Sequence, residues 1–225
     1  MTAVKRLMIL ITGLCLGQYA KSAPLAAPLA AVAEALSTEE LRELQGKLNR
    51  RASLAVDFVQ TRTSALRPSR PSVSSGKAIF AKPAKFRWTL EKPQEDILIF
   101  DGTNIFSYKP GDKIVSRFKT EGGRAKEIKE IIDFVLDFDA LLRRYKLEKA
   151  VRVGQLITLN LTPKIPTQVT NLNITVDAKD YFVGVVSMIF TNKNTSEIQF
   201  SNPVAGKVDS KSFASPVGLA VVDGF

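Results

Sequence analysis

Alternation of apolar and polar side chains dominates the chain and predicts a sheet of many strands. On residues 85–91, Phe86, Trp88 and Leu90 alternate with charged or polar neighbours, so this strand has one apolar face. The same period recurs in short segments divided by turn-forming residues, which is typical of one barrel or strongly curved antiparallel sheet. The expected strands are residues 52–63, 76–82, 85–91, 95–101, 104–109, 112–119, 145–152, 155–162, 168–177, 181–191 and 194–201.

Two other segments have the period of a helix. Ser37 and Glu40 form a capping box ahead of leucines at helical spacing, which predicts a first amphipathic helix that ends near Arg51. Apolar positions recur at helical spacing over residues 124–144, and we expect two short helices there that separate near Asp137. The sheet is therefore expected to be preceded by one helix and interrupted once by a helical segment.

Three segments show neither period. Residues 23–36 are of low complexity and are expected to form a flexible lead-in. Residues 64–75 are rich in Ser, Pro and Arg, which predicts a mobile loop, and the tail at 203–225 is expected to be irregular, with a turn of helix near Val208. Since no internal repeat or second domain is visible, residues 37–225 are expected to form one domain.

The first residues are typical of an export signal. Lys5 and Arg6 precede an apolar run at residues 7–16, and small residues stand at Ala20 and Ser22, where a signal peptidase reads the chain. The apolar run is too short to span a bilayer, so a cleaved signal peptide over residues 1–22 is favoured over a retained anchor.

The charge of the chain narrows the range of partners. The formal net charge is +10, and removing the three basic residues of the signal from the 32 in the chain leaves 29 against 22 acidic residues, or +7. A basic surface can bind nucleic acid, an anionic membrane face or an acidic protein. Export argues against nucleic acid, while a solvated basic surface without a dedicated partner remains an alternative.

The composition argues against an enzyme, a metal site and a cofactor site. The chain has no histidine, and its one cysteine, Cys15, lies inside the expected signal, so the commonest general base, thiol nucleophiles and thiolate ligands are missing from the mature protein. Ser74 and Lys77 fit a Ser-x-x-Lys motif but lie where a loop runs into a strand, not on the helix that the motif needs. Asp133, Asp137 and Asp139 are the densest carboxylate group and are expected to form a solvated face or helix caps.

Several of these segments resemble one family. The run GKAIFAKPAKFRWTLEKP at residues 76–93, ILIFDG at 97–102 and FSYKP at 106–110 are similar to the periplasmic outer-membrane lipoprotein carrier (LolA-like) family. The similarity extends into the tail, through VDSKSF at 208–213 and the Pro-x-Gly-x-x-Val pattern at 216–221. It therefore covers nearly all of the chain beyond the signal.

The resemblance implies a fold and a function. Family members have an unclosed antiparallel β-barrel, here of about ten or eleven strands, covered by a lid of short α-helices. They act in the periplasm of Gram-negative bacteria as monomeric chaperones without stable membrane insertion. They take acylated lipoproteins from an inner-membrane ABC transporter complex, shield the acyl chains, and deliver the cargo to an outer-membrane acceptor.

The resemblance also assigns roles to residues. A family arginine that latches the lid stands where this chain has Lys82, which is a flexible point donor without the planar fork of arginine. A lid that fills the empty cavity would compete with the acyl chains, so that cargo is not held irreversibly. The lid candidates are Ile131, Phe134, Val135 and Leu141, and the lipid-cavity candidates are Phe80, Phe86, Trp88, Leu90, Phe106 and Tyr108.

Other readings stay open. The same architecture could carry another lipid, such as a glycolipid, or serve as a lipid or lipoprotein sensor module. A serine–lysine hydrolase built on Ser74 and a structural envelope protein with a dry core are the remaining alternatives. The apolar alternation fits a dry core as well as a lipid cavity, because both need one apolar face.

Overall fold

The computed structural model describes residues 33–119, 135–206 and 208–224. The expected signal peptide, most of the lead-in and three residues named above, Ile131, Asp133 and Phe134, lie outside the described residues. Within these ranges, no helix combines the length and the apolar character needed to cross a membrane.

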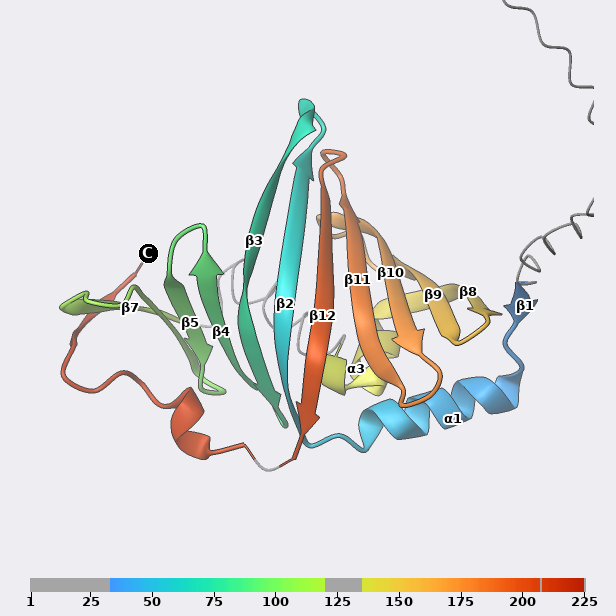
Figure 1. The fold of residues 1–225 in the computed structure, drawn as a ribbon, viewed down its shortest axis with the longest axis horizontal. Coiled ribbons are helices and arrows are strands. Elements are labelled where there is room, and N and C mark those ends of the chain that lie inside the picture. Colours follow the sequence, from blue (N-terminus) through green and yellow to red (C-terminus); the bar gives the residue numbers. More distant parts are fainter. Residues whose placement is uncertain (1–32, 120–134, 207, 225) are drawn as a thin grey trace, which may run out of the picture. The chain divides into compact units, whose positions relative to one another are not determined.

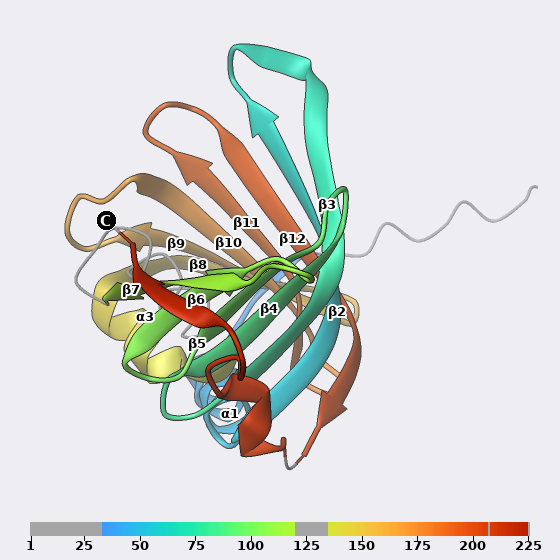
Figure 2. The same cartoon turned by 90° about the vertical axis from the view of Figure 1, so that its left-hand side faces the viewer.

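In the part of the chain that the structure describes, one unclosed sheet of thirteen strands forms the framework of the domain (Figures 1 and 2). All neighbours are antiparallel except the last, β13, which runs parallel to β7. The order across the sheet is β1-β8-β9-β10-β11-β12-β2-β3-β4-β5-β6-β7-β13, so β12 and β2, from distant parts of the chain, are central neighbours. The strands are β1 (Glu34–Ala35), β2 (Ser53–Ser64), β3 (Arg67–Ala81), β4 (Lys85–Lys92), β5 (Asp96–Phe100), β6 (Asn104–Tyr108), β7 (Ile114–Lys119), β8 (Tyr145–Val153), β9 (Leu156–Pro163), β10 (Val169–Asp177), β11 (Phe182–Phe190), β12 (Thr195–Ala205) and β13 (Ala220–Asp223).

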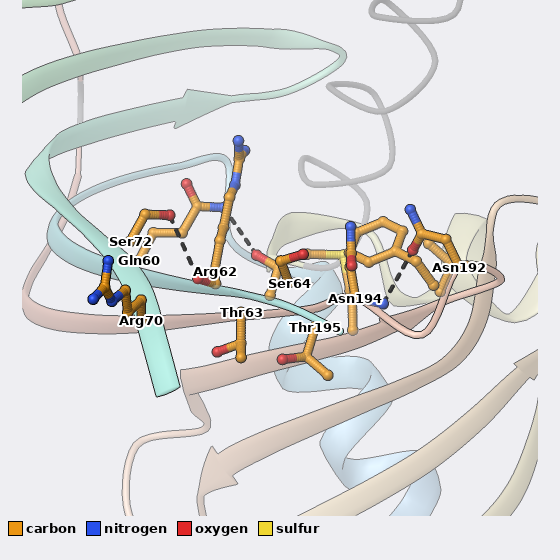
Figure 3. Close-up of a pocket in the computed structure, with 13 residues that line it drawn as sticks. Gln60, Arg62, Thr63, Ser64, Arg70, Ser72, Asn192, Asn194 and Thr195 are labelled. Carbon is orange, nitrogen blue, oxygen red and sulfur yellow. Dashed lines mark hydrogen bonds between the residues drawn. The ribbon is translucent and has the colours of Figure 1, made fainter. Parts of the chain in front are cut away.

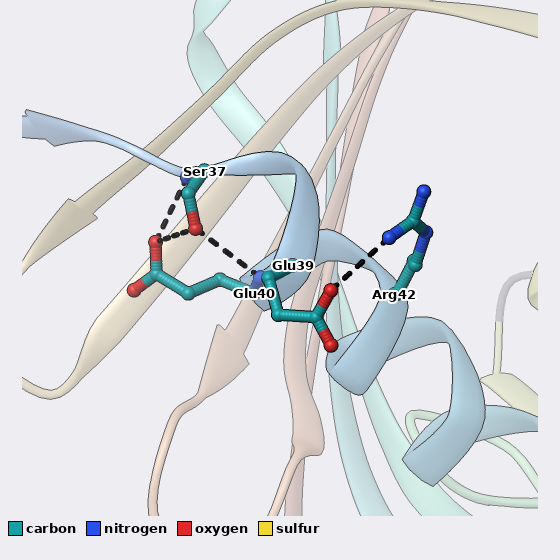
Figure 4. A network of polar contacts seen from close by, with 4 residues as sticks. All are labelled: Ser37, Glu39, Glu40 and Arg42. Atoms are coloured by element: carbon teal, nitrogen blue, oxygen red, sulfur yellow. Dashed lines mark hydrogen bonds and ion pairs between the residues drawn. The ribbon is translucent and has the colours of Figure 1, made fainter.

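Among the described residues, helices α1 and α3 and a turn of 3-10 helix accompany the sheet. Helix α1 (Thr38–Asn49) begins at the expected capping box, in which the Ser37 hydroxyl accepts from the Glu40 amide and the Glu40 carboxylate accepts from the Ser37 amide (Figure 4). Helix α3 (Phe138–Arg144) begins at the predicted break, where Asp137 caps the amide of Ala140. The turn η1 (Ser210–Phe213) lies close to the helical turn expected in the tail.

The predicted fold class is confirmed, with three local corrections. Residues 64–75 are not a loop, because β3 extends from Arg67 and pairs with β2 along its length. The end of the expected lead-in belongs to the sheet, since β1 pairs with β8 and the Leu36 amide donates to the Ala150 carbonyl at 3.1 Å. The tail contributes a strand, β13, which the sequence did not indicate.

The two faces of the sheet carry different apolar clusters. The larger cluster joins the strands to α1 and α3, and we call that side of the sheet the inner face. The smaller one includes Ile97, Ile99, Phe106 and Val115 and is covered by Phe213 of η1, and we call that side the outer face. In Figures 1 and 2, α1 and α3 lie on the hollow side of the curved sheet.

Candidate functional site

The inner face of the sheet forms an apolar surface that helices cover. Leu44 and Leu48 of α1 pack into it, and so do Phe138 and Leu141 of α3, each no more than 3% exposed. The helical spacing of these residues gives each helix one apolar side, which is what burial against a sheet requires. We call α1 together with residues 135–144 the helical cover.

Four of the predicted cavity residues lie on the inner face. Phe80 and Phe86 are fully buried, while Trp88 and Leu90 are partly buried at the edge of the same cluster. The ring of Trp88 packs on that of Phe58 with centroids 3.8 Å apart. Of the four, the Trp88 and Leu90 side chains are therefore the ones within reach of a molecule that arrives from solution.

The two remaining cavity candidates lie on the other side of the sheet. Phe106 and Tyr108 belong to the outer-face cluster with Ile99 and Phe213, and so they do not line the same surface as Phe86. Their partner strand explains the difference: Phe106 is opposite Ile99 in the β5–β6 pairing, and Ile105 is the β6 residue that points inward. The prediction that all six aromatic and aliphatic residues face one cavity is wrong for this pair.

Two of the four lid candidates, Val135 and Leu141, are among the described residues. Val135 and Leu141 are 2% and 0% exposed and pack into the inner-face cluster. Leu136 and Phe138, which were not singled out, make the same contact. Their position on the helical period was the signal that could have included them.

Lys82 contacts the helical cover directly. Its Nζ donates to the backbone carbonyl of Asn49, the last residue of α1, at 2.6 Å. The Asn49 side chain in turn accepts from the Phe138 amide at 2.9 Å, at the first residue of α3. A lysine at the β3–β4 turn, the end of α1 and the start of α3 are thus joined by two consecutive hydrogen bonds. The positive charge also lies at the negative end of the α1 dipole, which favours the contact.

Several other polar contacts of the helical cover lie at the surface, among them the bond from Lys164 Nζ to the Leu142 carbonyl at 2.7 Å. Gln45 of α1 donates to Asp139 of α3, and Arg152 of β8 pairs with Glu40 at 3.1 Å. Hydrogen bonding from Ser37 is the main cause that lowers the pKa of Glu40. Since exposed pairs contribute little, burial of the leucines holds α1 in place more than these contacts do.

A cavity opens on the inner face beyond the aromatic residues, and we call it the rim cavity (Figure 3). Its volume is about 410 Å³, and it lies toward the β2–β3 and β11–β12 turns. The sequence prediction missed it, although the signal was present: the inner-facing series Val56, Phe58, Gln60, Arg62 changes from apolar to polar within one strand. The lining residues are Gln60, Arg62, Thr63, Ser64, Arg70, Ser72, Val169, Met188, Phe190, Asn192, Asn194, Thr195 and Ser196.

The structure provides no catalytic pair at Ser74. Ser74 and Lys77 are three residues apart on strand β3, so their side chains point to opposite faces of the sheet. No group of His, Cys, Asp or Glu side chains among the described residues is arranged to hold a metal ion. The hydrolase reading that depends on this pair is therefore wrong.

These features define a mainly β protein whose single unclosed sheet has an apolar inner face under helices. Residues 49–215 match the family described as "Outer membrane lipoprotein carrier protein LolA". The chain belongs to this family, as the sequence resemblance predicted.

Individual relatives agree with the family match. The outer-membrane lipoprotein carrier protein of Chromobacterium violaceum is 28% identical over 206 residues, which are 90% of this chain and 95% of the relative. The protein of the same name from Vibrio campbellii is 27% identical over 185 residues, 80% and 84% of the two chains. An uncharacterized conserved protein from Thermus thermophilus has a similar structure, with a TM-score of 0.52 at 10% identity over 82% of this chain and 99% of that one, and it supports the fold alone.

Proposed function

We propose that this protein is a periplasmic carrier that shields the acyl chains of lipoproteins and takes them from an inner-membrane ABC transporter complex to an acceptor at the outer membrane. Family membership supports the cargo class. The observation that carries the proposal is the continuous apolar inner face under a cover made of separate helices. An acyl chain can occupy that face only if the helices give way, since interiors are close-packed.

Competition between helices and cargo makes delivery possible. Each buried methylene contributes about 0.8 kcal/mol, so three acyl chains in an open apolar cavity would dissociate very slowly. When the helices must first leave the inner face, their own burial is subtracted from the cargo's affinity. The net affinity is then a small difference that a partner protein can shift.

Individual residues receive roles in this scheme. Trp88 and Leu90 form the accessible part of the lipid surface, with Phe80 and Phe86 behind them. Val135 and Leu141, together with Ile131 and Phe134, fill the surface while cargo is absent. Lys82 acts as the latch, because its bond to the Asn49 carbonyl is made only while α1 is in place.

Trp88 provides the test, because it is the only tryptophan in the chain. Addition of a triacylated lipopeptide is expected to shift its emission to shorter wavelength, and a deacylated peptide of the same sequence is expected to leave it unchanged. Unchanged emission at saturating lipopeptide would count against a lipid surface at Trp88.

Two matched variants connect the binding to the inner face. Leu90→Gln on the inner face should weaken lipopeptide binding and transfer, while Ile79→Gln on the outer face should not, and both residues are partly buried on neighbouring strands. Phe86 is unsuitable for this purpose, since a polar group at a fully buried position would impair folding itself. Equal loss in both variants would point to stability instead of a specific surface.

The principal alternative is a carrier or sensor of another lipid, such as a glycolipid, with the same fold. Native mass spectrometry of the protein purified from its own envelope separates the two. A bound triacylated polypeptide would support lipoprotein carriage. A bound glycolipid would support the alternative, a carrier or sensor of another lipid.

A further inference from the structure

The rim cavity contains polar groups that the apolar inner face does not explain. Only Ser53, Gln60 and Ser196 are buried polar side chains among the residues that the structure describes, and two of these three line the cavity. The Gln60 amide donates to the Ser196 hydroxyl at 3.0 Å, across the β2–β12 pair. Burying polar groups costs free energy unless they are hydrogen-bonded, so this pair gives the cavity a satisfied polar wall.

The mouth of the cavity is cationic. Arg62 and Arg70 lie on neighbouring strands, and none of the thirteen lining residues is acidic. Within the described ranges, neither guanidinium has a hydrogen bond or an ion pair. The Arg62 side chain extends from the strand alongside Gln60 (Figure 3). Exposed guanidinium groups in the lining of one cavity attract an anion, and their planar donors match phosphate or carboxylate oxygens.

The floor of the cavity is apolar and continuous with the inner face. Val169, Met188 and Phe190 line the cavity and also belong to, or pack against, the inner-face cluster. Methionine adapts its shape to flexible chains, and Phe190 supplies a partly exposed ring. The cavity thus has one positively charged side and one apolar side, which is the pattern of a site for an amphiphile.

We propose that the rim cavity binds a single-chain anionic amphiphile, with its phosphate or carboxylate head at Arg62 and Arg70 and the first part of its chain on Val169, Met188 and Phe190. The volume of about 410 Å³ suits a head group with part of one chain, and not three chains together. This ligand differs from the cargo proposed above, since the lipid end of a triacylated cysteine carries esters and an amide but no anion. The inference does not depend on lipoprotein carriage.

Calorimetric titration of the purified chain with dodecyl phosphate below its micellar concentration tests this proposal. Binding is expected to be at least tenfold tighter than that of uncharged dodecyl maltoside and to weaken with added salt. Laurate and inorganic phosphate are titrated separately as two further ligands. Laurate should bind like dodecyl phosphate, and inorganic phosphate should bind at least tenfold more weakly, because it has no chain. Equal affinity for the charged and uncharged dodecyl compounds, or for phosphate with and without the chain, would overturn the proposal.

Variants assign the binding to the cavity. The double variant Arg62→Gln/Arg70→Gln should lose at least tenfold in affinity for dodecyl phosphate, while Arg67→Gln, on the same hairpin but outside the lining, should keep the affinity within twofold. All three arginines are exposed, so folding should be unaffected. An unchanged affinity in the double variant would disprove the site. Lipopeptide binding, followed through Trp88 in parallel, should be unaltered in the double variant, so failure of one proposal can be told from failure of the other.

Discussion

At the scale of single residues, the Lys82 side chain joins the sheet to the end of α1, and the Asn49 side chain joins α1 to α3. Lys82→Gln removes the charged donor to the Asn49 carbonyl and should lower the free energy of unfolding by about 1 kcal/mol. For a chain of this size that corresponds to a fall in Tm of roughly 2–4 °C. Lys85→Gln, three residues further on and without a contact to the helices among the described residues, should change Tm little, and urea titration of both variants provides the measurement. An equal effect in the two variants would mean that charge, and not the Asn49 contact, matters.

Two glycines give opposite predictions for the same change. A Cβ at Gly76 would lie 1.9 Å from the backbone oxygen of Thr89, so Gly76→Ala must push β3 and β4 apart and should cost about 1–3 kcal/mol. A Cβ at Gly46, inside α1, meets nothing within 4 Å, and Gly46→Ala should raise stability by about 0.5–1 kcal/mol. Thermal unfolding of both variants, compared with wild type, measures the two effects. A destabilised Gly46→Ala would show that α1 does not tolerate the added methyl group.

The side chains of the inner face could be predicted from the sequence only in part. Alternation correctly separated Phe86 and Trp88 from their polar neighbours, because it is a property of one strand. It could not align Phe106 with them, because which face of β6 points inward depends on turn length and pairing register. The contact of Lys82 with Asn49 joins segments 33 residues apart, and only the family resemblance indicated it.

At the scale of elements, the start of α1 depends on a reciprocal pair that pH can weaken (Figure 4). Ser37→Ala removes both hydrogen bonds of the Ser37 hydroxyl, from the Glu40 amide and to the Glu40 carboxylate, while the bond from the backbone amide of residue 37 stays. The change should cost about 1 kcal/mol at neutral pH. Because hydrogen bonds from Ser37 lower the pKa of Glu40, the stability from its carboxylate is present above the ordinary value of 4.5 and is lost as pH falls through the lowered value. The difference between wild type and variant should therefore shrink in acid, as measured by urea unfolding from pH 7 to pH 3.

A control separates the cap from the surface charge beside it. Glu39 forms an exposed pair with Arg42 at 3.1 Å, and Glu39→Gln should change stability by only a few tenths of a kcal/mol. A gap between wild type and Ser37→Ala that stays constant down to pH 3 would show that the hydrogen bond from the Ser37 hydroxyl to the Glu40 carboxylate does not contribute.

The first half of strand β3 was predicted as a loop, and the reason lies in its local sequence. This half is rich in Ser, Pro and Arg, which signals a loop when the segment is considered alone. In the structure, this half pairs with β2 from Ser64 opposite Arg67 onward, and the neighbouring strand supplies the order that local propensity lacks. The capping box of α1 was predictable for the opposite reason, since all its partners lie within four residues.

At the scale of the whole domain, the proposed function links stability to affinity. If helices and cargo compete for the inner face, any change that weakens only the covered state must lower stability and raise cargo affinity by the same free energy. A property of this kind is invisible in the sequence, because it depends on two arrangements of one chain. The contact between Lys82 and Asn49 allows a test, since it is made by the cover and not by the lipid surface.

Lys82→Gln should therefore bind a triacylated lipopeptide about fivefold more tightly than wild type, the equivalent of about 1 kcal/mol. Lys85→Gln should bind as wild type does. Titration followed through Trp88 gives the affinity, and the urea midpoint of the same preparations gives the stability. A destabilised Lys82→Gln with unchanged affinity would mean that the helices do not leave the inner face when cargo binds, because weakening a cover that stays in place cannot favour the bound state.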